Sequence, residues 1–331
     1  MTTSRIRKPR RSSPDKPRPD AYQVITDQII ALLDAGTVPW HKPWNSGAGD
    51  GVPLPLSMSS RKPYRGINVW LLAISAMTHG YSSPWWGTYQ QISDRGGQVR
   101  KGEKSTQVVL WKPIEVDDET KPGAKRKAFL LRTFNVFNAD QADGLDDLKV
   151  QPEPADEEDE ERAEVERIEA CEAALAAYYL TGPSLAFGGN AAYYVPSADH
   201  VQMPPRESFE SSEALYGTWF HETVHSTGHK SRLARKDLLE SHSFGDRSYS
   251  REELVAEMGA AFLSGLTGIA AETLPQSASY LEHWISVLKG DKKLLVSAAA
   301  QAQKAVDLIL GDAAPVATEE ESEPVAETVT V

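Results

Sequence analysis

The sequence predicts an α+β fold in two domains, a small α/β domain followed by a mostly helical one. The chain has 331 residues, 40% of them apolar and 25% charged, which is enough for more than one unit with a core. The long strand-like runs fall in the first half, and helical patterns dominate the second. Charge divides in the same way, because residues 1–132 carry a net +10 and residues 133–331 a net −22.

The first half predicts a domain over residues 21–139, preceded by a basic, proline-rich tail at 1–20 that we expect to be disordered. Apolar residues recur at helical spacing from Tyr22 to Leu33. The following elements are expected to be a buried helix (68–79), a short helix (88–95) closed by two glycines, and two strands (106–114 and 128–137) joined by a hairpin loop.

The second half predicts a domain over residues 162–311 after an acidic linker at 140–161. The expected elements are a helix running to about 180, a strand near 192–201, and helices over about 208–228, 251–265, 277–289 and 293–310. Residues 312–331 form an acidic tail without a core pattern.

Composition excludes several classes of protein. Cys171 is the only cysteine, so an intramolecular disulfide and a cysteine-based metal cluster are ruled out. No apolar stretch reaches the ~18–20 residues that cross a bilayer, and no apolar segment follows the basic N-terminus as in a secretory signal. We expect a soluble, cytoplasmic protein without membrane contact.

The clearest chemical motif is His-Glu-Thr-Val-His at residues 221–225. Histidines at i and i+4 share one helix face, so His221 and His225 can hold one metal ion, with zinc the expected ion. Glu222 lies beside that position and can act as general base on a water molecule. The alternative is a helix with two satisfied histidines and a surface glutamate.

A zinc site of this kind needs a third protein ligand. His229 and the ligand position six residues after His225, which is occupied by Ser231, are poor candidates. A carboxylate from a later helix fits better, with Glu253 as ligand and Glu257 supporting a ligand histidine from behind. Ser250 and Glu253 also match a helix-capping box, in which case Glu257 would be the ligand instead.

The expected chemistry is that of a zinc metalloendopeptidase. Glu222 would take a proton from water and later deliver it to the leaving amine. Tyr249 could hydrogen-bond the developing oxyanion, although a core tyrosine is the alternative. The strand near Tyr193–Gln202 could pair with an extended substrate.

The first half has the composition of a single-stranded nucleic-acid module, because tryptophans and basic residues are interleaved. Trp70 and Trp111 fit core positions, whereas the tryptophans in loops can stack on bases. The candidate DNA-binding residues are Trp40, Lys42, Trp44, Arg61, Lys62, Arg65, Trp85, Trp86, Arg100, Lys101 and Lys104. Solvated surface charge is the competing interpretation.

Five segments, in this order, resemble antirestriction proteins of the ArdC type: PWHKPW, RKPYRGINVWLL, GGQVRKGEKSTQVVLW, HETVHSTGHKSRLAR and YSREELVAEMGAAFL. The resemblance covers roughly residues 22–138 and 190–290. It implies a single-stranded-DNA-binding domain followed by a zincin-like metallopeptidase domain, in a protein of mobile genetic elements that protects incoming DNA from host restriction. His221, Glu222 and His225 match the family's HExxH, and Glu253 its later glutamate. The acidic linker and both tails depart from the pattern.

Three functions follow as hypotheses. The chain could be a DNA-directed metalloprotease that cuts a host DNA-associated or restriction protein. It could instead be a non-catalytic protector that coats single-stranded DNA and keeps a structural or vestigial metal site. The third hypothesis, a free peptidase, is disfavoured by the charge division.

Overall fold

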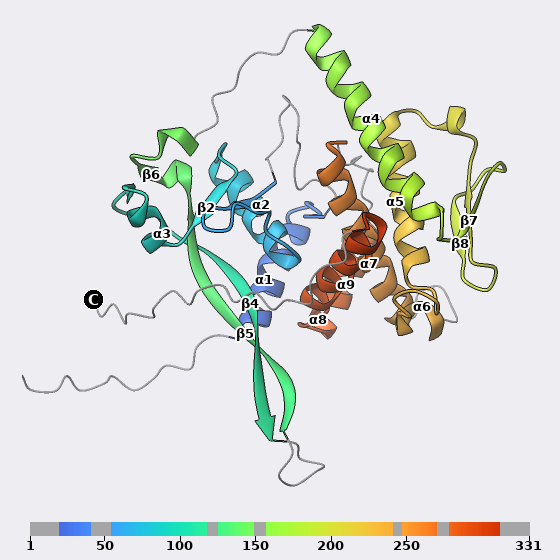
Figure 1. Ribbon diagram of the computed structural model, residues 1–331. Helices are drawn as coiled ribbons and strands as arrows, with labels where there is room; N and C mark the ends of the chain where they lie inside the picture. Colours follow the sequence, from blue (N-terminus) through green and yellow to red (C-terminus); the bar gives the residue numbers. More distant parts are fainter. Residues whose placement is uncertain are drawn as a thin grey trace, which may run out of the picture.

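The computed structural model describes residues 20–40, 54–117, 125–148, 157–240, 247–269 and 278–311, and Figure 1 shows their arrangement. The N-terminal elements lie on one side and β7 to β9 on the other, with the C-terminal helices between them. The expected tails lie outside the described residues, except for Asp20. This carboxylate caps the first helix by accepting a hydrogen bond from Tyr22 N at 3.0 Å.

Among its described residues, the N-terminal part combines three α-helices with two small sheets. Its helices are α1 (Ala21–Asp34), α2 (Ile67–His79) and α3 (Tyr89–Asp94). One sheet has the order β1-β2-β5-β4, with strands β1 (Leu56–Ser57), β2 (Trp85–Gly87), β4 (Thr106–Asp117) and β5 (Lys125–Asn138). The second sheet pairs β3 (Gln98–Val99) with β6 (Ala142–Asp143).

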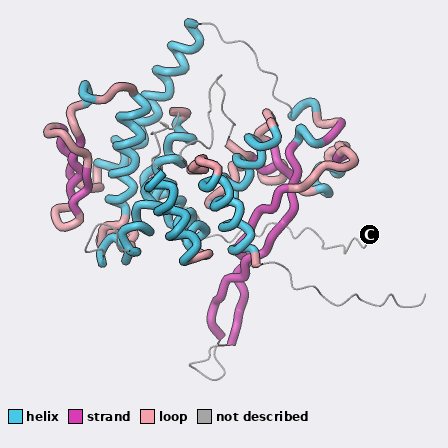
Figure 2. Tube along the Cα trace, turned by 180° about the vertical axis from the view of Figure 1, so that it is seen from behind, coloured by secondary structure: helices cyan, strands magenta, loops and turns pink. Residues whose placement is uncertain are grey.

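The antiparallel β4–β5 hairpin is the longest feature of the N-terminal part. Its register runs from Thr106 opposite Val136 to Asp117 opposite Lys125. Figure 2 shows that the end of the hairpin projects away from the rest of the molecule. Both strands continue beyond the runs of 106–114 and 128–137 predicted from their apolar residues.

The C-terminal part is mostly helical, as predicted, and its described residues include one small sheet. Its helices are α4 (Glu157–Tyr179), α5 (Ser212–Thr227), α6 (Lys236–Glu240), α7 (Arg247–Thr267), α8 (Ala278–Gly290) and α9 (Leu294–Ile309). The sheet has the order β7-β9-β8, with strands β7 (Ser184–Phe187), β8 (Tyr193–Val195) and β9 (His200–Met203). Within the described ranges, no helix combines the length and apolar character needed to cross a bilayer.

The segment expected to be an acidic linker is ordered at its start. Leu145 and Leu148 are buried in a cluster with Met58 and Ile92, which extends the packed N-terminal part to residue 148. The reason is that these leucines, although flanked by acids, supply enough apolar surface to pack. At the other end of the expected linker, α4 already begins at Glu157.

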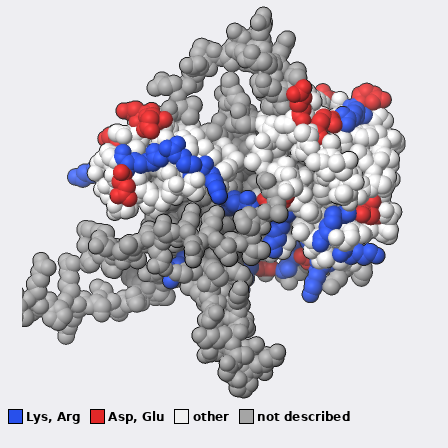
Figure 3. Space-filling model, in the orientation of Figure 1, with Lys and Arg blue, Asp and Glu red and all other residues white. Residues whose placement is uncertain are grey.

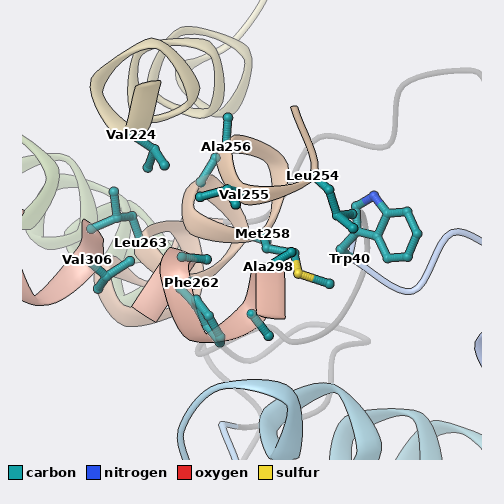
Figure 4. Close-up of a cluster of buried hydrophobic side chains, with 14 of the residues drawn as sticks. Trp40, Val224, Leu254, Val255, Ala256, Met258, Phe262, Leu263, Ala298 and Val306 are labelled. Atoms are coloured by element: carbon teal, nitrogen blue, oxygen red, sulfur yellow. The ribbon is translucent and has the colours of Figure 1, made fainter. Parts of the chain in front are cut away.

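Helix α7 lies at the centre of the largest core and is contacted from both parts of the chain. Its residues Leu254, Met258 and Phe262 are buried, and Phe262 packs on Trp70 of α2 with ring centroids 4.2 Å apart. Figure 4 shows Val224 of α5 on one side of α7 and Trp40 from the N-terminal part on another. The largest core of the described residues is therefore continuous across both parts of the chain.

Candidate metal centre

Two histidines of α5 face a glutamate of α7. The helix begins after Ser211, whose side chain accepts a hydrogen bond from Ala214 N at 3.1 Å. His221 and His225 lie one turn apart, and their Nε2 atoms are 3.1 Å from each other. Phe220 and Val224, the residues that directly precede the two histidines, are fully buried and anchor the helix in the core.

Glu253 of α7 completes the group. Its carboxylate oxygens lie 3.5 Å from His221 Nε2 and 3.5 Å from His225 Nε2. One donor atom from each of the three residues lies within 4.8 Å of the others. Two imidazole nitrogens and one carboxylate oxygen are a donor set that divalent zinc or manganese accepts, so the side chains fit the metal that the motif implies.

The charge around His221 favours a positive ion. Burial lowers the pKa of His221, but a hydrogen bond with Glu253 and the negative charges of Glu222 and Glu257 outweigh it and raise this pKa to about 9. These carboxylates thus stabilise a cation at the imidazoles, whether a proton or a metal ion. Glu222 is half-buried on the same helix, directly after His221.

The other ligand candidates lie elsewhere. His229 Nδ1 is 2.7 Å from Ser231 Oγ and 3.8 Å from Asp199 Oδ2. The capping-box interpretation of Ser250 and Glu253 does not hold, because α7 already begins at Arg247 and Ser250 lies inside it. The side chain of Tyr249 lies outside the described residues, so its oxyanion role stays a prediction.

The carboxylate that contacts the candidate ligand His225 from behind is Glu252, not Glu257 as predicted. Glu252 Oε1 lies 3.2 Å from His225 Nδ1, and only 3% of the residue is exposed. Burial raises its pKa, but the hydrogen bonds of Arg235 and His225 outweigh it and lower this pKa, so Glu252 remains a carboxylate. Glu257 instead accepts hydrogen bonds from Trp40 Nε1 at 2.5 Å and from Tyr280 Oη at 2.7 Å.

Glu252 and Arg235 were missed by sequence reasoning. Adjacent helix positions point about 100° apart, and nothing in the sequence indicates that both Glu252 and Glu253 face the histidines. Arg235 pairs with Glu252 across 17 residues, a contact that only the folded chain creates. A run of basic residues after the motif (HKSRLARK) was the one available signal, and it also fits a solvated loop.

Two of the four predicted DNA-binding tryptophans are not available for stacking. Trp40 and Trp86 are each only 1% exposed, so the prediction for these two is corrected. Trp40 is held by Glu257 and packs edge-on against Trp284, with centroids 5.7 Å apart. Trp85 is half-buried, with the Arg61 guanidinium 5.3 Å above its ring. Lys42 and Trp44 lie outside the described residues.

The predicted basic DNA-binding residues differ in whether they form ion pairs within the chain. Arg65 donates to Asp307 of α9 at 2.5 Å and 2.7 Å, and Arg100 donates to Glu103 at 3.1 Å. Lys62, Lys101 and Lys104 are exposed. Figure 3 shows Lys and Arg side chains forming a band across the N-terminal part.

A shallow depression lies in the same region. It is lined by Tyr89, Gln98, Val99, Arg100, Lys101, Glu103, Phe137 and Asp143. Tyr89 is 51% exposed, and its hydroxyl accepts a hydrogen bond from Gln98 Nε2 at 2.9 Å. The hollow therefore brings an accessible aromatic ring next to Lys101.

Comparison with known proteins separates the same two parts. Residues 19–137 match the family model for the N-terminal domain of the anti-restriction factor ArdC, and residues 170–301 match a zincin-like metallopeptidase domain. The chain is 40% identical to the metal-free crystal structure of the antirestriction protein ArdC from plasmid R388, with a TM-score of 0.68. That match covers 88% of this chain and 97% of the other. A Mn(II)-bound structure of the same protein matches with 39% identity and the same TM-score, covering 90% and 99%.

Curated relatives extend the comparison. The chain is 35% identical to the uncharacterized protein y4eC of Sinorhizobium fredii, with 93% of this chain and 94% of that protein covered. It is 34% and 35% identical to two DNA primases TraC of Escherichia coli, covering 91% and 87% of this chain but only 20% and 27% of the primases.

The fold and the site thus define a two-domain α+β protein in which an ArdC-type N-terminal domain is joined to a zincin-like metallopeptidase domain. The chain belongs to the ArdC antirestriction family.

Proposed function

We propose that the chain is a zinc-dependent metalloendopeptidase that acts on proteins bound to single-stranded DNA. One observation carries the peptidase part of the proposal, namely that His221, His225 and Glu253 converge while Glu222 lies beside them. A divalent metal held by the three ligands would supply the Lewis acidity that polarises a scissile carbonyl and acidifies water.

The roles of the protein groups follow from their positions. Glu222 is a half-buried carboxylate on the helix that carries both histidines, and it has the reach to take a proton from a water molecule in the site. The same carboxyl then delivers that proton to the leaving amine. Glu252 holds His225, and Glu253 supplies the third ligand from α7.

Glu222→Gln tests the peptidase. We expect the variant to bind zinc like the parent and to lose proteolysis of an unfolded protein such as casein, assayed with and without single-stranded DNA. The loss should be at least about 100-fold, since removal of a general base costs 10²–10⁴-fold in rate. Glu213→Gln, the same change nine residues earlier on α5, is the matched control and should keep activity. Loss of zinc by Glu222→Gln, or persisting proteolysis, would contradict the general-base role.

Single-stranded DNA binding is the second part of the proposal. It is supported by the exposed Lys62, Lys101 and Lys104, and by the Arg61–Trp85 pair, which offers a cation and an aromatic ring together. The depression with Tyr89 offers another ring beside Lys101. These groups could follow a phosphate backbone while stacking unpaired bases.

A triple lysine variant tests this part. Changing Lys62, Lys101 and Lys104 to Ala should weaken binding of an oligothymidine strand and reduce the slope of log K against log salt by up to about 2, since each single-strand phosphate contact contributes about 0.7. The control changes three exposed lysines of the C-terminal part, Lys236, Lys289 and Lys304, by the same charge. If both variants behave alike, the contact is not located in the N-terminal part.

We propose that these two activities protect incoming DNA of a mobile element in the cytoplasm, in keeping with the antirestriction protein ArdC of plasmid R388 named above. The protein target would be a host DNA-associated or restriction protein. The alternative is a protector that binds single strands without cleavage and keeps a structural metal site. A Glu222→Gln variant that protects DNA as well as the parent would favour that alternative.

A further inference from the structure

Arg235 is a charged side chain buried directly behind the metal centre. It follows the C-terminus of α5 and is only 7% exposed. A buried guanidinium needs partners for its charge and its donors, because an unpaired charge in the interior is strongly destabilising. Arg235 has such partners on two sides.

One side of Arg235 clamps Glu252. Nε donates to Oε2 at 2.9 Å and Nη2 donates to Oε1 at 2.5 Å, which is the forked geometry in which arginine and carboxylate hold each other's orientation. The other side of the guanidinium caps the C-terminal end of α5. Nη2 also donates to the carbonyl of Val224 at 2.7 Å, and Nη1 donates to Thr227 Oγ1 at 2.5 Å.

Glu252, held in place by Arg235, in turn orients the candidate ligand His225. Its Oε1 lies 3.2 Å from His225 Nδ1, so the carboxylate accepts a hydrogen bond from Nδ1–H and leaves Nε2 free to coordinate. His225 Nε2 is the atom that faces His221 and Glu253. Arg235, Glu252 and His225 thus form one chain of hydrogen bonds that ends at the metal-binding nitrogen.

We propose that Arg235 is a positioning residue of the metal site. It holds Glu252 as an oriented carboxylate, and Glu252 in turn fixes the tautomer and ring orientation of His225. The inference deepens the proposed function, since it rests on His221, His225 and Glu253 binding a metal. It does not require that the protein cleave a substrate.

Arg232 provides a matched control on the same loop. It also donates to a carbonyl at the end of α5, from Nη2 to Ser226 O at 2.7 Å, and it also pairs with a carboxylate, that of Asp199. Asp199 belongs to the turn before β9 and also accepts a hydrogen bond from Tyr194 Oη at 2.9 Å. Arg232 therefore anchors α5 in a similar way, but its carboxylate partner does not hold a metal ligand.

The experiment compares Arg235→Met with Arg232→Met in the full chain. Zinc affinity is measured by competition with a chromophoric chelator at fixed pH, and the thermal stability of the metal-free protein is measured by circular dichroism. Both variants should lower the melting temperature. Only Arg235→Met should weaken zinc binding, by about tenfold to a hundredfold, the usual effect of losing an outer partner of a metal ligand.

Two outcomes would overturn the proposal. If Arg235→Met loses stability but binds zinc like the parent, Arg235 only caps the helix. If both variants weaken zinc binding equally, the effect comes from general loosening of α5. Because zinc affinity is measured without substrate, a failure to find proteolysis would sink the proposed function and leave this inference standing.

Two further variants test the positioning role of Arg235 if Arg235→Met does not fold. Arg235→Lys keeps the charge beside Glu252 but not the fork, and Glu252→Gln keeps the shape but replaces a charged acceptor with a weaker neutral one. Both should bind zinc less tightly than the parent, and parent-like affinity in either would overturn the proposal. The double variant Arg235→Lys with Glu252→Gln should lose less than the product of the two single losses, since both act through His225.

Discussion

The thiol of Cys171 illustrates what burial does to a single reactive group. The side chain is 0% exposed within α4, and burial raises the pKa of the thiol to about 11. At pH 8 only about one thiol in a thousand is then a thiolate, the form that reacts with alkylating agents. Cys171 is therefore a core residue in the native protein.

Thiol labelling tests this at the residue scale. Iodoacetamide should modify Cys171 in the native protein at least about 100-fold more slowly than in the denatured chain at pH 8, and the native rate should rise as pH rises toward 11. The measurement is the modified fraction by mass spectrometry over time. Rapid native labelling at pH 8 would show that α4 opens readily or that the thiol is accessible.

Individual site residues could be predicted where the local helix geometry alone fixes which side chains share a face. His221 and His225 belong together because helix spacing places them on one face, and the need for a third ligand from a later helix pointed to Glu253. Glu252 and Trp40 could not be assigned correctly in this way. Their positions depend on which side of a helix or loop meets the core, and Trp40 finds Glu257 across 217 residues of sequence.

The close approach of α5 to α7 depends on one glycine, Gly259. A Cβ added at Gly259 would lie 2.7 Å and 2.8 Å from the two Cγ atoms of Val224, a fully buried residue of α5 between His221 and His225 in sequence. Because valine is stiff at χ1, it has little freedom to move away. The glycine thus lets the helix that carries Glu252 and Glu253 approach the helix that carries the histidines.

Gly259→Ala tests this contact at the scale of the element. Alanine gains about 1 kcal/mol of helix propensity, but overpacking typically costs about 1–3 kcal/mol, so we expect net destabilisation together with weaker zinc binding. Gly217→Ala on α5 is the control, because nothing lies within 4 Å of its added Cβ. It should stabilise the protein by up to about 1 kcal/mol in denaturant unfolding. A stabilised Gly259→Ala variant would contradict the tight contact.

The larger elements were predictable and the short ones were not. Amphipathic periodicity in segments such as 22–33 and 293–310 led to α1 and α9, because a helix that buries one face needs that spacing. The strands β1, β3 and β6 have two residues each and carry no period at all. Their pairing is decided by neighbours far along the chain, such as β3 with β6.

The whole molecule is held together by contacts between its two domains. Lys292 pairs with Asp20 at 2.6 Å, Arg65 pairs with Asp307 at 2.5 Å, and Thr26 Oγ1 donates to Lys292 O at 3.0 Å. These polar contacts surround the shared core in which Trp70 meets Phe262. The opposite charges of the two halves predicted separate tasks, but charge patterns do not reveal which apolar faces meet.

Trp70→Ala tests whether the domains unfold together. The substitution should destabilise the protein by about 3–5 kcal/mol. If the two domains form one cooperative unit, the slowest-exchanging amides of α7 and α9 should lose protection to the same extent as those of α2. The measurement is native-state hydrogen exchange read by mass spectrometry. Loss confined to α2 would mean that the domains unfold separately.

The shared core also bears on how such a protein can be inherited. A cut between the domains would expose the apolar faces of α1 and α2 on one fragment and of α7 to α9 on the other, which favours aggregation. The two domains are therefore expected to be gained and lost as a single cassette. The match to the TraC primases fits this expectation, since 306 residues spanning both domains recur inside a protein about five times as long.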